Sequence, residues 1–123
     1  MEQVTMNLEH WLRLLSVINA CPIGSRGDWQ AIDRLGTLIE ATEDEKPLAN
    51  WAEHRDAETG HEWVTFKRGV PFTREMTSTQ KERLLHIAEN PPEACPWIRR
   101  DKDLRTAIIT ALGGNPHNWG GEE

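Results

Sequence analysis

The sequence predicts an α+β fold that is mostly helical, in which two helical hairpins flank a central β-hairpin within a single domain. Four segments carry apolar residues at three- and four-residue spacing, which is the period of an amphipathic helix. Between the second and third of them lie residues 50–67, which contain the turn signal Thr59-Gly60. On either side of this turn, side chains would alternate between the two faces of a β-hairpin. A length of 123 residues suits one domain, and we expect residues 1–114 to form it and residues 115–123 to be a flexible tail.

The first helix is expected over residues 6–20, with residues 1–5 frayed ahead of it. Thr5 or Asn7 can cap its start, and Pro22 cannot continue it. Its apolar stripe consists of Leu8, Trp11, Leu12, Leu15 and Ile18. Two further apolar residues widen this stripe, so we expect the first helix to be the central one.

A second helix is predicted from Trp29 to about Thr42, with Asp28 as its N-cap. In this register Trp29 lies on the inner stripe together with Ile32. Gly36 falls in the middle of the helix, where it costs ~1 kcal/mol relative to alanine. A close crossing with another helix would explain the glycine.

The central hairpin is predicted to close through a four-residue loop, because Asp56 can accept backbone hydrogen bonds and Gly60 can adopt a left-handed conformation. One face then carries Trp51, Val64 and Phe66 near the base, with Arg55 and Glu62 paired near the tip. The other face carries Ala52, His54, Asp56, His61, Trp63 and Thr65. A two-stranded hairpin is marginal alone, so we expect the helices to cover its apolar face. A five-residue loop would exchange the two faces.

The second half of the chain is expected to contain two more helices. A capping box, Thr77 to Gln80, starts a helix over about residues 78–89, after a turn-rich connection at residues 68–73. Asp101 caps the fourth helix, which runs to Leu112 and ends before two glycines.

The two halves resemble each other in order. Each contains a helix, then an Ala-Cys-Pro turn, at residues 20–22 and 94–96, and then an Asp-capped helix. A duplication would give the fold an approximate two-fold symmetry. Chance similarity between amphipathic helices is the alternative.

The charge of the chain is unevenly distributed. Residues 1–62 hold twelve acidic and five basic residues, a net charge of −7, whereas residues 63–123 hold eight acidic and nine basic residues, a net charge of +1. Phosphates would repel the acidic half, which disfavours nucleic-acid binding there. Such a surface suits a basic protein partner.

The composition excludes several protein classes. No apolar run approaches the ~20 residues that a membrane span needs. The N-terminus lacks the basic and apolar regions of a signal peptide, so we expect a cytoplasmic protein. Cys21 and Cys95 are too few for a disulfide framework, and we expect both to be buried thiols. We expect no cofactor.

Two alternatives to a protein-binding role remain open. His54, Asp56 and His61 share one predicted face of the hairpin and offer a metal-dependent enzyme two imidazoles and a carboxylate, although their spacing fits no metal motif. A nucleic-acid-binding regulator would use the basic start of the fourth helix, at Arg99, Arg100, Lys102 and Arg105. The connection before it is longer than a helix-turn-helix allows.

The sequence favours a non-enzymatic protein–protein interaction module that occupies a basic surface on a larger partner. Its profile, small and acidic without catalytic groups, is similar to that of phage-encoded inhibitors of host defence such as anti-CRISPR proteins, although no motif carries that similarity. The predicted partner-binding residues are Glu43, Asp44, Glu45, Asp56 and Glu58.

Overall fold

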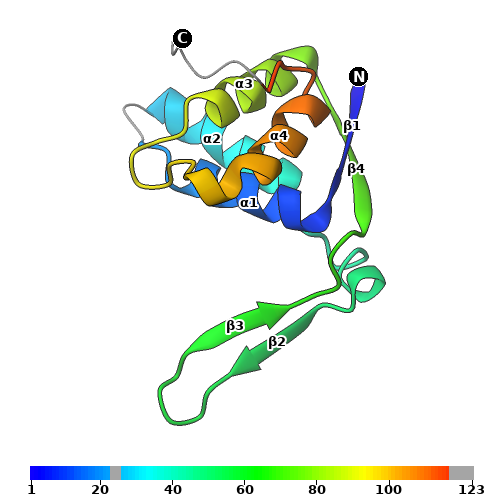
Figure 1. The fold of residues 1–123 in the computed structure, drawn as a ribbon, viewed down its shortest axis with the longest axis vertical. Helices are drawn as coiled ribbons and strands as arrows, with labels where there is room; N and C mark the ends of the chain where they lie inside the picture. The colour runs from blue at the N-terminus through cyan, green and yellow to red at the C-terminus, as the bar shows by residue number, and fades with distance from the viewer. Residues whose placement is uncertain (23–25, 117–123) are drawn as a thin grey trace.

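Four α-helices and two separate two-stranded antiparallel sheets make up residues 1–22 and 26–116, the parts of the chain that the computed structural model describes. Figure 1 shows the helices packed together in one α+β body, with one sheet beside them and the other projecting away. The elements are β1 (Glu2–Asn7), α1 (Leu8–Asn19), α2 (Arg26–Ile39), β2 (Ala52–Arg55), β3 (Glu62–Thr65), β4 (Pro71–Met76), α3 (Ser78–Glu89) and α4 (Lys102–Ala111). Two short 3-10 turns, η1 (Pro47–Ala49) and η2 (Arg99–Asp101), lie in the connections. Within these described ranges, none of the helices combines the length and the apolar character that crossing a bilayer demands.

The sheet of β1 and β4 corrects two expectations from the sequence. Residues 1–5 were expected to be frayed and residues 68–73 to be a turn-rich connection, but Glu2–Asn7 pairs with Pro71–Met76 along its whole length. Side chains alternate across this sheet, so that Val4, Met6, Phe72, Arg74 and Met76 are buried. The period-two pattern is present in both segments, yet neither shows locally that it has a partner about 70 residues away.

Helix α1 is the central helix, as its wide apolar stripe predicted. It packs against α2, α3, α4 and β1. Trp11 is fully buried, and its Nε1 donates a hydrogen bond to the backbone oxygen of Phe72, 2.9 Å away. The buried core around it includes Leu8, Leu14, Val17, Ile18, Leu35, Ile39, Leu84, Ile108 and Ile109.

The helix limits match the sequence prediction where a local signal fixes them. Helix α3 begins after Thr77, and the predicted capping box with Gln80 is present. Helix α2 instead begins at Arg26, so Asp28 lies in its first turn and is not the N-cap. Trp29 was predicted to face inward, but it is 52% exposed.

The hairpin of β2 and β3 has the predicted register, with Arg55 opposite Glu62 and Ala52 opposite Thr65. Gly60 adopts φ +73°, as the four-residue loop requires. Two helices precede the hairpin and two follow it in the chain. The expectation that they cover it is wrong, because it projects from the body (Figure 1) and Val64 is 39% exposed. Trp51 and Phe66, which stack at its base, do pack against the core. The four helices bury their apolar stripes against one another instead.

Each half of the body is a strand followed by two helices. In the first, β1 leads to α1 and α2; in the second, β4 leads to α3 and α4. Across the halves, β1 contacts α4 and β4 contacts α2. Val4 pairs with Arg74, and their separation of 70 residues also relates Arg13-Leu14-Leu15 to Arg83-Leu84-Leu85. This reciprocal arrangement places the hairpin in the connection between the two units.

Candidate interaction site

The loop of the projecting hairpin, residues 52–65 (the arm), is held by two of its own side chains. The Thr59 hydroxyl accepts a 3.2 Å hydrogen bond from the backbone nitrogen of His61. Asp56 accepts hydrogen bonds at Oδ1 from the backbone nitrogens of Glu58 (2.8 Å) and Thr59 (3.4 Å). At the base, the backbone nitrogen of Lys67 donates to the oxygen of Ala49 over 2.7 Å. The arm is therefore ordered at its tip and fixed where it meets the body.

One face of the arm carries an exposed aromatic stack. The indole of Trp63 stacks on the imidazoles of His54 and His61, with ring centroids 5.3 and 5.8 Å apart. His54 Nε2 also lies 2.8 Å from the hydroxyl of Thr65. Trp63 is 43% exposed, so the stack presents an indole to solvent that two neighbouring rings hold in place.

The arm is also acidic. Its exposed side chains include four carboxylates, at Glu53, Asp56, Glu58 and Glu62, and one guanidinium, at Arg55, which gives a net charge of −3 with neutral histidines. Because this charge stands away from the body, it can approach a partner surface without interference from the helices.

The metal site proposed on this face finds no support in the geometry. His54 and His61 do share the face, but both imidazoles stack on Trp63, and the carboxylate of Asp56 is bound to the loop backbone. In the described part of the chain, no three His, Cys, Asp or Glu side chains gather to hold a metal ion.

The acidic stretch at residues 43–45 is partly structural. Glu45 forms a two-contact ion pair with the buried guanidinium of Arg74, which also lies 5.6 Å from the ring centre of Trp11. Burial by itself raises the pKa of Glu45, but hydrogen bonds from Arg74 and from Thr42 outweigh it and lower that pKa. Glu45 therefore ties the chain to β4 and is not free for a partner.

The other two carboxylates of this stretch remain on the surface. Glu43 accepts a 2.9 Å hydrogen bond from Lys46 and is exposed, as is Asp44. Of the five predicted partner-binding residues, Glu43, Asp44 and Glu58 thus keep exposed carboxylates that are not holding the fold together.

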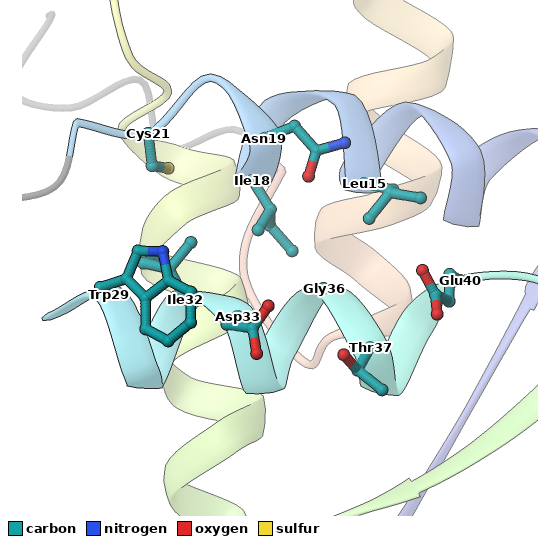
Figure 2. A pocket seen from close by; sticks show the side chains of 10 residues that line it. All are labelled: Leu15, Ile18, Asn19, Cys21, Trp29, Ile32, Asp33, Gly36, Thr37 and Glu40. Atoms are coloured by element: carbon teal, nitrogen blue, oxygen red, sulfur yellow. The ribbon is translucent and has the colours of Figure 1, made fainter. Parts of the chain in front are cut away.

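A depression of about 260 Å³ lies between α1 and α2. Figure 2 shows Leu15 and Ile18 of α1 pointing toward α2, with Asp33 and Glu40 on the α2 side. Its complete lining is Leu15, Ile18, Asn19, Cys21, Trp29, Ile32, Asp33, Gly36, Thr37 and Glu40. Residues 29, 33 and 36 of α2 and Glu40, directly after its end, follow helical spacing. This signal was present in the sequence, although Trp29 was assigned to the core.

A second depression, of about 290 Å³, adjoins the first through Leu15 and Glu40. Its other lining residues are Leu12, Ala41, Glu43, Lys46 and Trp51. The two neighbouring depressions are together called the α1–α2 groove, and Trp29 lines the first and Trp51 the second.

The basic residues proposed for nucleic-acid binding do not form one surface. Arg99, Arg100 and Lys102 are exposed, but Arg105 is only 1% exposed and donates to the backbone oxygen of Pro116 over 2.7 Å. Burial lowers the pKa of the Arg105 guanidinium, although the nearby Glu89 opposes this. Arg105 therefore stabilises the end of the body.

The two cysteines are half-buried free thiols, less enclosed than the sequence suggested. Burial, and to a smaller degree the neighbouring Cys95, raises the pKa of Cys21. A raised pKa reduces the thiolate fraction, so Cys21 lacks the activation that a nucleophile requires.

No protein-family model matches the chain, and searches of curated proteins and of solved structures give no match either. Any functional conclusion therefore depends on the surfaces described above. Most of the predicted flexible tail, residues 117–123, lies outside the described residues.

Proposed function

We propose that this chain is a non-enzymatic protein-interaction module, of the inhibitor or adaptor type, that presents its arm to a basic surface on a larger partner. The observation that carries the proposal is the arm itself. Residues 52–65 project from the body with both faces accessible, as Figure 1 shows.

The exposed side chains of the arm suit a protein interface. Tryptophan is enriched among the residues that dominate binding energy at interfaces, and Trp63 is held in place by two stacked histidines. Little conformational freedom is left for it to lose on binding, which favours affinity. Val64, which is 39% exposed, gives the opposite face of the arm an apolar contact of its own.

The position of the arm in the chain supports the same proposal. It lies in the connection between two strand–helix–helix units whose helices bury their apolar stripes without it. A short connection would join these units, and a two-stranded hairpin contributes little stability alone. A role outside the fold would account for the presence of the arm.

The charge of the arm defines the partner. The net charge of −3, from four carboxylates and one guanidinium, would be attracted to a basic surface. This attraction would increase the association rate and weaken with added salt. In this mode Trp63 supplies apolar contact, while Glu53 and Glu58 supply the electrostatic complementarity.

Charge reversal on the arm tests the proposal. We expect the double substitution Glu53→Lys and Glu58→Lys to weaken capture of the partner from a lysate of the source cells by ~10-fold, and to reduce the salt dependence of binding. Captured proteins would be quantified by mass spectrometry at low and high salt.

The matched control is Glu82→Lys with Glu93→Lys, because both positions are exposed and lie off the arm. Both double variants change the net charge from −6 to −2, so only the position of the charge differs. An equal loss of partner capture in both double variants, or no loss in the arm variant, would contradict the proposal. Salt-sensitive binding of random duplex DNA by the unaltered chain would favour the nucleic-acid alternative.

A further inference from the structure

We propose that the α1–α2 groove is a second binding site, and that its occupant is a basic amphipathic segment of a partner protein. Apolar side chains of that segment would lie against the apolar side chains of the groove, and its Lys or Arg side chains would reach Asp33 and Glu40. The inference extends the proposed function, because it assigns a second contact to the same class of basic partner.

The groove is long enough to hold a peptide. Its two depressions, of about 260 and 290 Å³, share Leu15 and Glu40 in their linings. From Trp29 to Glu40, which directly follows the last residue of α2, the chain rises roughly 16 Å at 1.5 Å per residue. A groove of this length between two helices accommodates about three turns of a peptide helix, which is a recurring recognition mode.

The lining of the groove is chemically mixed. Partly buried apolar side chains, at Leu12, Leu15 and Ile32, lie beside the polar Asn19 and Thr37. Three carboxylates line the groove, at Asp33, Glu40 and Glu43, against the single ammonium of Lys46. An acidic lining that also offers a few apolar side chains complements a segment that carries both basic and apolar side chains.

The tryptophans of the two depressions strengthen the case for a cationic occupant. Lys46 Nζ lies 5.3 Å from the ring centre of Trp51, so this groove already contains one ammonium over an indole. Trp29 offers a second indole that is 52% exposed. A Lys or Arg side chain entering beside Asp33 would meet both a carboxylate and an aromatic face.

Gly36 lines the first depression of the groove. A glycine inside a helix costs ~1 kcal/mol relative to alanine. The predicted reason, a close helix crossing, is wrong: a Cβ built at Gly36 would lie 3.8 Å from Leu15 Cδ1, which is an ordinary contact. Packing within the chain does not require the glycine, but a side chain there would enter the groove.

Peptide selection can test the site before any partner is identified. A displayed library of random peptides would be selected on the full chain, and we expect enrichment of amphipathic sequences rich in Lys and Arg. Their affinity should fall ~10-fold for Asp33→Asn with Glu40→Gln, and should be retained by the control Glu82→Gln with Glu93→Gln.

Replacement of Gly36 separates binding from folding. We expect Gly36→Ala to raise the melting temperature, because alanine favours the helix, and yet to weaken binding of the selected peptides. Gly36→Leu should weaken binding further. A lower melting temperature for Gly36→Ala, or unchanged affinity in both variants, would overturn the inference.

The arm variant distinguishes the failure of this inference from the failure of the proposed function. Peptides that bind the groove should bind Glu53→Lys with Glu58→Lys as tightly as the unaltered chain. If the selected peptides bind the groove variants but not the arm variant, the groove would be excluded as their binding site and the arm would be supported. Selection that enriches acidic or uncharged peptides, or no peptides, would also overturn the groove site.

Discussion

At the residue scale, the contact between Arg74 and Glu45 shows how a sequence of charges can be misinterpreted. Arg74 is 8% exposed, and a buried guanidinium requires a hydrogen-bonded counter-ion. Glu45 supplies it from the acidic stretch that the sequence assigned to a partner. Nothing in the local sequence distinguishes Glu45 from Glu43 and Asp44, because the distinguishing feature is a residue 29 positions away.

Loss of this ion pair should destabilise the fold at neutral pH. We expect Glu45→Gln to lower the free energy of unfolding by about 2–3 kcal/mol, because the buried Arg74 charge loses its counter-ion. Urea denaturation followed by circular dichroism would measure the change. Glu43→Gln is the control, and its exposed pair with Lys46 should contribute less than ~1 kcal/mol.

The same pair predicts a dependence on pH. The pKa of Glu45 is lowered in the folded state, so its contribution is fully present above the unfolded value and is lost as pH falls through the folded value. The stability difference between the unaltered chain and Glu45→Gln should therefore narrow only below about pH 4.5, the usual carboxyl range. A difference that stayed constant into stronger acid would argue against the ion pair.

At the scale of single elements, helix α3 depends on its capping box. The backbone nitrogen of Gln80 donates to the Thr77 hydroxyl over 3.1 Å, and the backbone nitrogen of Thr77 donates to Gln80 Oε1 over 2.9 Å. We expect Thr77→Ala to reduce the free energy of unfolding by ~1 kcal/mol. Asn7 is a matched control, because it caps α1 without a side-chain hydrogen bond and Asn7→Ala should cost less. Equal losses, measured by thermal unfolding, would contradict this account.

Elements defined by local signals could be predicted from the sequence, whereas elements defined by distant partners could not. The loop of the arm and the start of α3 follow from residues within four positions of each other, and both were predicted correctly. The pairing of β1 with β4 depends on contacts about 70 residues apart, so it was missed. The groove was missed for a related reason: Trp29 is apolar, and its assignment to the core concealed its spacing with Asp33 and Gly36.

At the scale of the whole molecule, the two strand–helix–helix units should fold without the arm. We expect replacement of residues 53–64 by an Asn-Gly turn, which would join the paired residues Ala52 and Thr65, to change the free energy of unfolding by less than ~1 kcal/mol. Trp11→Ala should by contrast lower the free energy of unfolding by about 3–5 kcal/mol, because it leaves a cavity in the buried core. Calorimetry would check both, and loss of a cooperative transition in the shortened chain would show that the arm belongs to the fold.

The backbone hydrogen bond from Lys67 to Ala49 joins the two chain segments at the base of the arm, so the chain leaves and re-enters the body at nearly the same place. A protrusion anchored in this way can be exchanged without disturbing what lies beneath it. The body is therefore suited to serve as a scaffold for other β-hairpins. A change of binding target would require substitution of only a few exposed residues.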